Sequence, residues 1–214
     1  WMSEDLRKQT GIKVLVWYEN GFRNMTNSKR PIREPEDMKG IKMRTMESPV
    51  YMRFMEALGA SATPIPISEL VMSLQQGVVD GQENASSNVY EVGMADVQDF
   101  FSTTEHIYSF GTLIMPDEVF NGLSNEEQRI ILEAASLMRM TTNSAKVATD
   151  RSYIERIRDE KGLKVHLTTA KQKESCRKQT QGPVREYIEE QLGIYIVERL
   201  LAAVEESEKS VYGK

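Results

Sequence analysis

The sequence predicts an α/β fold, in which short strands alternate with helices. Residues 41–45 alternate apolar and polar side chains, which is typical of a short strand. Residues 49–58 and 69–76 carry apolar side chains at helical spacing, whereas the two prolines within residues 60–67 predict an extended segment. Strands that alternate with helices of this length are typical of βαβ units, which pair their strands in parallel.

The amino-terminal residues predict a helix and then a strand that is broken by a turn. Residues 1–10 are expected to be helical and to stop at Gly11, and residues 12–18 form a mostly apolar run that is typical of a buried strand. Glu19–Gly21 is expected to break this strand, and the dipeptide Asn20–Gly21 by itself favours an ordinary turn. Residues 22–32 are expected to follow as an extended segment.

Capping residues mark the two helices of the central stretch. Ser48 is expected to cap the first helix, and Gly59 is expected to end it. Ser68 is expected to cap the second helix, which should end at Gly77. A tight turn is predicted over residues 80–84, directly after a short apolar run.

The second half of the chain predicts a strand, a long helix and two terminal helices. Residues 100–115 are rich in aromatic and β-forming residues, so they are expected to cross back through the sheet. Ser124–Glu127 forms a capping box for a helix that should run to about residue 161 and either bend or bridge two lobes. A strand is expected over residues 163–167, and two more helices from Pro183 onward.

The composition is that of an ordinary globular protein. Of the 214 residues, 40% are hydrophobic and 28% are charged, and the formal net charge is −5. This charge argues against a nucleic-acid partner, whose phosphates require a basic surface. Cys176 is the single cysteine, so no internal disulfide can form. No apolar run approaches the roughly 20 residues that span a bilayer, so direct membrane insertion is not expected.

Arg44 is the residue on which a binding function would be centred. It lies at the carboxyl end of a predicted strand, where open α/β sheets bind their ligands. Its guanidinium offers a planar fork of donors that matches a carboxylate. The alternative is a solvated or structurally paired surface arginine, because most arginines are exposed.

A catalytic function has weaker support. Asp80 and Glu83 could act as a pair of carboxylates, but no nucleophile with a base accompanies them. We expect them instead to fix the turn, or to brace an arginine so that its fork points correctly. His106 and His166 have no metal-ligand spacing around them, so no metal or other cofactor is expected.

The chain resembles the DctP-like substrate-binding proteins of TRAP transporters. The matching stretches are ENGFRNMTNSKRPI, EDMKGIKMRTMESPVY, ALGASATPIPISELVMSLQQGVVDGQEN and LSNEEQRIILEAA, in the order and spacing of that family. The resemblance implies a periplasmic-binding-protein-like clamshell of two lobes, with mixed sheets flanked by helices and a long helix that bridges the lobes. Such a protein binds an organic acid and does not convert it, and Asn20–Gly21 becomes a candidate hinge between its lobes. The resemblance further implies delivery of that acid to TRAP membrane subunits, and a periplasmic location.

The resemblance also assigns residues to lobes. Residues 1–20, 110–149 and 178–214 are expected to form the remainder of one lobe, and residues 21–109 and 150–177 the lobe that carries the carboxylate-binding arginine. Family members carry a further amino-terminal region before this sequence begins, so the chain is expected to be a partial clamshell.

The family's ligand-holding residues fall on specific positions of this chain. The carboxylate-holding arginine falls on Arg44, a supporting arginine on Arg23 and a pocket asparagine on Asn84. The family often has an aromatic residue where this chain has Ile67, which changes the expected pocket shape. The full predicted ligand-binding set is Arg44, Arg23, Asn84, Met46, Ile67, Glu83 and Tyr108, although a packed core position is the favoured reading for Tyr108.

The identity of the acid stays open at this point. Dicarboxylates, keto acids and sugar acids, sialic acid among them, all satisfy one arginine. A sensor of the same build would bind the same ligand but would contact a signalling protein. An enzyme acting on a small carboxylate is the least favoured reading, because the nucleophile is absent.

Overall fold

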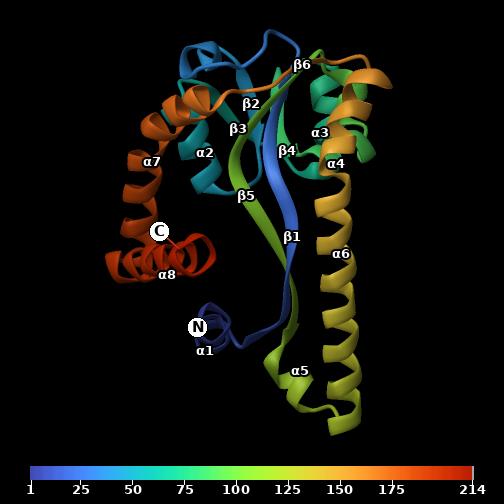
Figure 1. The fold of residues 1–214 in the computed structure, drawn as a ribbon, viewed down its shortest axis with the longest axis vertical. Helices are drawn as coiled ribbons and strands as arrows, with labels where there is room; N and C mark the ends of the chain where they lie inside the picture. Colours follow the sequence, from blue (N-terminus) through green and yellow to red (C-terminus); the bar gives the residue numbers. More distant parts are fainter. Residues whose placement is uncertain (214) are drawn as a thin grey trace.

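Six strands form one mixed sheet in the order β3-β2-β4-β1-β5-β6 (Figure 1). The computed structural model describes residues 1–213, and the side chains of all of these except Val147 and Tyr212. β2 pairs in parallel with β3 and β4, and β5 with β6, whereas β1 is antiparallel to β4 and β5. The strands are β1 (Ile12–Asn27), β2 (Lys42–Thr45), β3 (Ser61–Pro64), β4 (Gly81–Ala85), β5 (Phe100–Pro116) and β6 (Lys164–His166). The predicted α/β class is therefore confirmed.

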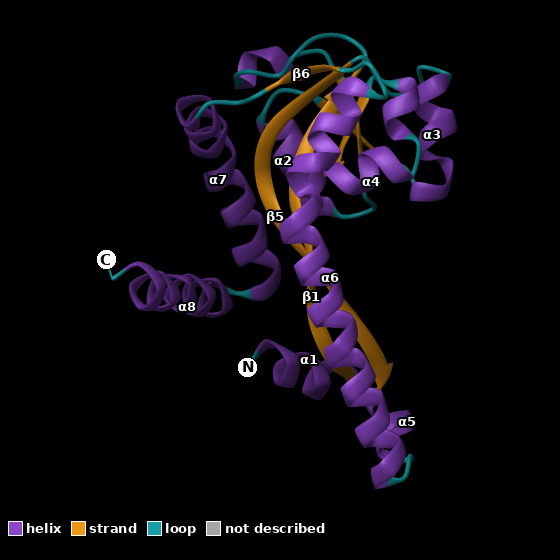
Figure 2. Ribbon diagram, turned by 45° about the vertical axis from the view of Figure 1, so that its right-hand side comes forward, coloured by secondary structure: helices purple, strands orange, loops and turns teal. Residues whose placement is uncertain are grey.

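Helices cover the sheet and extend beyond it (Figures 1 and 2). The long strands β1 and β5 extend beyond the short strands as a two-stranded ribbon, and α6 runs alongside this ribbon. α1 and α5 lie near the far end of this ribbon, and α7 leads away from the short strands to α8. The helices are α1 (Met2–Thr10), α2 (Pro49–Ala57), α3 (Ile67–Gln75), α4 (Ser86–Glu91), α5 (Asp117–Asn121), α6 (Asn125–Asp159), α7 (Ala170–Leu192) and α8 (Ile194–Tyr212), with 3-10 turns at Pro35–Met38 and Met94–Val97.

Two apolar clusters hold the short strands between helices. Met43 of β2, Met55 of α2 and Cys176 of α7 belong to the cluster beneath α2 and α7. Phe101 of β5 and Ile157 of α6 belong to the other, which also contains buried residues of α3 and α4. No helix within residues 1–213 combines the length and the apolar character that crossing a membrane requires.

Several predicted elements are confirmed. α1 ends at Gly11, which adopts the left-handed conformation of a helix C-cap. Ser124 and Glu127 cap α6 reciprocally, with Glu127 N donating to Ser124 Oγ at 3.3 Å and Ser124 N to Glu127 Oε2 at 2.8 Å. α6 spans 35 residues and ends at Asp159, close to the predicted end near residue 161.

Two predicted breaks in strands were wrong. Glu19–Gly21 does not end β1, because the strand absorbs these residues as a bulge with Gly21 at φ 93°. Residues 80–84 are not a tight turn, because Gly81–Ala85 forms the buried strand β4 between β1 and β2. The local turn-forming preference is overridden here by pairing on both sides of the strand.

Two predicted helix boundaries were also wrong. Ser68 does not cap α3, because the helix already begins at Ile67 after Pro66. Pro183 does not begin a new helix but lies inside α7. Val184 next to this proline packs against the cluster beneath α2, so tertiary contacts hold the helix on both sides of it. Ser48 stands at the N-cap of α2 as predicted, but its side chain makes no capping hydrogen bond.

The close approach of β4 to β1 yields a first prediction. A Cβ on Gly81 would lie 2.3 Å from the carbonyl oxygen of Thr26 and 2.7 Å from Asn27 Cβ. We expect Gly81→Ala to lower the free energy of unfolding by about 1–3 kcal/mol in urea titrations, because backbone atoms must shift. Gly122→Ala is the matched control, since its Cβ would meet nothing closer than 3.4 Å. Equal stability of the two variants would contradict the tight packing of β4.

Candidate anion-binding site

Arg44 lies near the carboxyl end of β2 and is almost completely buried, with 2% of its surface exposed. Its Nε donates to the carbonyl oxygen of Ile65 at 2.6 Å, in the segment between β3 and α3. Its Nη1 is buried without any hydrogen-bond partner among the residues described. No carboxylate within residues 1–213 forms an ion pair with Arg44. The guanidinium is therefore anchored at Nε and leaves its far end unsatisfied.

The surroundings of Arg44 make this a site of uncompensated positive charge. Burial lowers the pKa of Arg44, the Glu83 carboxylate opposes that effect, and repulsion from Arg23 adds to it. A buried charge is tolerated only when it is paired or hydrogen-bonded. Glu47, exposed in the loop after β2, contributes a weaker opposing attraction.

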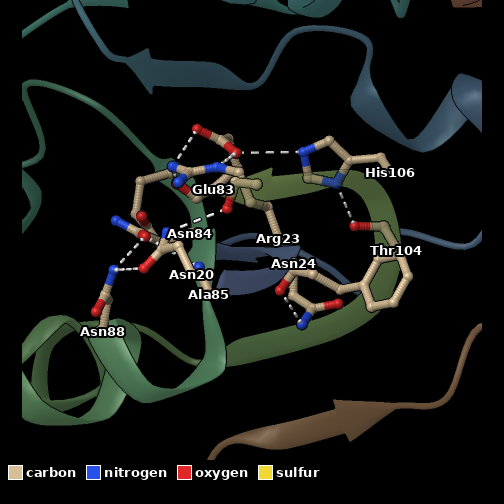
Figure 3. A network of polar contacts seen from close by, with 12 residues as sticks. Asn20, Arg23, Asn24, Glu83, Asn84, Ala85, Asn88, Thr104 and His106 are labelled. Atoms are coloured by element: carbon tan, nitrogen blue, oxygen red, sulfur yellow. Dashed lines mark hydrogen bonds and ion pairs between the residues drawn. The ribbon is translucent and has the colours of Figure 1, made fainter. Parts of the chain in front are cut away.

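Arg23 has its own carboxylate (Figure 3). Arg23 Nε donates to Glu83 Oε2 at 2.5 Å and Nη2 to Oε1 at 2.8 Å, in a bidentate pair. Nη2 also donates to the carbonyl oxygen of Glu83 at 2.9 Å. Glu83 is fully buried at 0% exposure, so it faces Arg23 rather than solvent. This is the arginine-bracing role that the sequence offered as an alternative for Glu83.

His106 completes the arrangement around Glu83. Its Nε2 lies 3.3 Å from Glu83 Oε2, and its Nδ1 lies 2.8 Å from Thr104 Oγ1. Burial acts to raise the pKa of Glu83, but hydrogen bonds from His106 and Arg23 outweigh it, and the pKa is lowered. Sequence reasoning missed His106, because only the course of β5 through the sheet brings it beside Glu83. The ring of Phe54 stacks on the imidazole at 4.9 Å between ring centres.

Asn84 points a carboxamide toward α4 from the end of β4 (Figure 3). Its Oδ1 accepts hydrogen bonds from Ala85 N and from Asn88 Nδ2, both at 2.9 Å. Its Nδ2 donates to no other group within residues 1–213 of the chain. Asn84 therefore keeps its Nδ2 amino group free to donate, as the predicted role in ligand binding requires.

The remaining predicted residues are less enclosed. Ile67 is 48% exposed at the start of α3, and Met46 is half-buried in the loop after β2. The packed core position favoured for Tyr108 was wrong, because its side chain is 45% exposed and meets Phe22 edge to face. Partial burial of the side chain and a hydrogen bond with Glu19 raise the pKa of Tyr108 to about 12.

The paired-carboxylate alternative finds no support in this geometry. Asp80 Oδ2 accepts from Lys42 N at 2.9 Å, and its Oδ1 lies 3.2 Å from Lys29 Nζ. Asp80 therefore ties the start of β2 to the start of β4, whereas Glu83 is held by Arg23. Neither carboxylate is free for acid–base work.

A cavity of about 590 Å³ adjoins the Glu83 network between α2, β5 and α7. Tyr51 lines this cavity, and its ring centre lies 5.5 Å from Arg23 Cζ. Arg44 and Asn84 do not line it. The cavity borders the Arg23 side of the site, and its volume is in the range of small-molecule pockets. Its other lining residues include Phe54, Thr104, His106, Cys176 and Thr180.

Comparison with known proteins gives a consistent result. Residues 2–191 match the family described as "DctP: Bacterial extracellular solute-binding protein, family 7". A solute-binding protein of Verminephrobacter eiseniae is 44% identical over 125 residues, which cover 58% of this chain and 37% of that protein. The 2,3-diketo-L-gulonate-binding periplasmic protein YiaO of Escherichia coli is 37% identical over 125 residues, covering 58% of this chain and 38% of that protein.

Solved structures share the same fold. A TRAP periplasmic solute binding protein from Polaromonas sp. JS666, bound to D-erythronate, superposes with a TM-score of 0.81 at 34% identity. The match covers 93% of this chain and 64% of that one. The chain thus spans only part of the length of the proteins it matches, and less than half of the two curated relatives.

The buried pair of Arg23 and Glu83 yields a second prediction. We expect Glu83→Gln to lower the free energy of unfolding at neutral pH by about 3–5 kcal/mol, because it leaves Arg23 buried without a counter-charge. The pKa of Glu83 is lowered in the folded state. The ionised carboxylate therefore stabilises the fold at pH values above the ordinary pKa of a glutamate, and this stabilisation is lost as the pH falls through the lowered pKa. The difference between wild type and variant should therefore narrow in acid.

Urea titrations at several pH values measure this difference. Glu133→Gln is the control, since Glu133 is exposed on α6 and forms a surface ion pair with Arg129. If the free energy of unfolding of the wild type exceeded that of Glu83→Gln by the same amount from neutral pH to strong acid, the ionised Arg23–Glu83 pair would be contradicted.

Proposed function

Since the chain belongs to the DctP family of bacterial extracellular solute-binding proteins, we propose that it binds the carboxylate of an organic acid at Arg44. The unsatisfied Nη1 of Arg44 is the observation that carries this proposal. A buried donor without a partner costs about 1–3 kcal/mol, and a charged one more, which a ligand oxygen would relieve. With Nε held by Ile65, the carboxylate meets the Nη1–Nη2 end of the fork.

The neighbouring groups support an anionic ligand. Arg23 is paired with Glu83, so it does not offer the ligand a second free charge. Asn84 offers a free Nδ2 donor for a second oxygen of the ligand. Each charge-assisted hydrogen bond to such a ligand contributes about 1.5–3 kcal/mol. Tyr51 and His106 line the cavity that adjoins the Arg23–Glu83 pair, and the proposal extends a larger ligand toward this side.

The chemical class of the ligand is a small carboxylate. Two relatives bind acids that carry several oxygen atoms besides the carboxylate, 2,3-diketo-L-gulonate in one and D-erythronate in the other. An acceptor-rich acid suits a site that offers Arg44 and the free donor of Asn84. The proposal therefore favours hydroxy and keto acids over acids with long hydrocarbon chains.

The proposed physiological role is that of an extracytoplasmic receptor. The protein would hold the acid in the periplasm and pass it to the membrane subunits of a TRAP transporter, binding it reversibly and without turnover. Residues 21–109 and 150–177 would form the lobe that grips the carboxylate, and closure would follow because the ligand makes more contacts in the closed state. The remaining residues would belong to the opposing lobe.

Substitution of Arg44 tests this proposal. We expect Arg44→Lys to weaken binding of the tightest acid at least about tenfold, because lysine keeps the charge but loses the planar fork. Isothermal titration calorimetry with succinate, D-erythronate and D-glucuronate measures the effect. Arg151→Lys is the control, since the Arg151 side chain is 93% exposed on α6.

Two results would contradict the proposal. One is an Arg44→Lys protein that binds the acid as tightly as wild type. The other is a wild-type protein that binds none of the three acids at millimolar concentration.

A further inference from the structure

A relay of side-chain amides connects Asn84 through Asn88 to Asn20 on β1 (Figure 3), and from there to β5. Asn88 Nδ2, on α4, donates to Asn84 Oδ1 at 2.9 Å and reaches Asn20 Oδ1, on β1, at 3.5 Å. Asn20 Nδ2 donates to Ser109 Oγ at 3.1 Å, and Ser109 Oγ donates to the carbonyl oxygen of Gly21 at 2.9 Å. The relay therefore joins β4, α4, β1 and β5.

Backbone groups at both ends fix the direction of every bond in this relay. Ala85 N can only donate, so the atom of Asn84 that faces it must be the carboxamide oxygen. The Gly21 carbonyl can only accept, so the Ser109 hydroxyl must donate to it and accept from Asn20. Asn20 consequently turns its oxygen toward Asn88, which leaves Asn88 as the donor to Asn84.

This direction determines what Asn84 can offer to a ligand. Its Oδ1 already accepts two hydrogen bonds, which match the two lone pairs of a carboxamide oxygen. Rotating the carboxamide would place Nδ2 against the Ala85 N–H and the Asn88 amide, donor against donor. The side chain is therefore locked with Nδ2 turned away from α4.

We propose that Asn88 is a positioning residue that locks the carboxamide of Asn84 so that only its donor faces the ligand. The inference rests on the proposed function, and it adds that this position of the site selects for a ligand oxygen that accepts a hydrogen bond. Ligand groups that only donate, such as an ammonium, are rejected there. Asn88 does this through Asn84 and without touching the ligand.

A double-mutant cycle tests the proposal by calorimetry with the tightest of succinate, D-erythronate and D-glucuronate. We expect Asn88→Asp to weaken binding about tenfold, since an aspartate cannot donate to Asn84 Oδ1 and draws Nδ2 toward itself. Asn88→Ser keeps a donor and should stay within about threefold of wild type. In an Asn84→Ala background, Asn88→Asp should cost less than about a further twofold, because the group it acts on is gone.

The added charge of the aspartate needs its own control. Asn125→Asp places the same charge in the first turn of α6, where an acidic residue is favourable, and should leave affinity unchanged. An Asn88→Asp effect that persists fully in the Asn84→Ala background would mean direct electrostatic repulsion, and it would overturn the positioning role.

A second measurement does not depend on any ligand. Hydrogen exchange of the Ala85 amide, followed by NMR, reports whether Asn84 Oδ1 still accepts its proton. We expect this exchange to accelerate about tenfold or more in Asn88→Asp and to be unchanged in Asn125→Asp. Equal exchange in wild type and Asn88→Asp would overturn the inference even if the protein bound an acid. Accelerated exchange without any acid binding would uphold the lock while contradicting the proposed function.

Discussion

The pairing of Arg23 with Glu83 is the constraint on which the site depends. Two arginines are buried close enough for their charges to repel, and the strand between theirs brings the carboxylate of Glu83 to Arg23. Glu83 commits both of its oxygens to Arg23, with His106 as a further neighbour, and it leaves Arg44 without a counter-charge. Among the charged residues buried within residues 1–213, Arg23, Glu83 and Asp80 form ion pairs and Arg44 does not, which is why we propose an anionic ligand as its partner.

The fold explains how these groups come together. β4 lies between β1 and β2, so Glu83 reaches Arg23 on one neighbour while Arg44 stands on the other. Asp80 and the absence of a side chain at Gly81 allow β4 to enter this position, and two apolar clusters clamp the strands from opposite sides. The long ribbon of β1 and β5 then carries the chain away from the site, with the Asn20 relay lying at the level where β4 ends its pairing.

The sequence predicted most helices and strands, but it predicted less well how segments distant in the chain pair and contact one another. Periodicity located the helices of the central stretch and the long helix α6, and the resemblance to a known family pointed to Arg44, Arg23 and Asn84. The strand β4 escaped prediction because Asp80–Asn84 has turn-forming residues, and only burial between two strands makes them extended. The sequence offered the bracing of an arginine as an alternative for Glu83 but could not say which arginine. The contacts of His106 and Asn88 could not be predicted, because they depend on how distant segments of the chain are placed beside one another.

The central claim is that the free end of Arg44 receives a ligand carboxylate. A crystal structure of the protein with a bound acid, identified by mass spectrometry of the same preparation, tests it most directly. The account predicts a carboxylate oxygen at about 2.7–2.9 Å from Arg44 Nη1, the distance of a charge-assisted hydrogen bond, with the Arg23–Glu83 pair intact. An acid bound elsewhere, while Arg44 Nη1 bonds to a protein group, would contradict it.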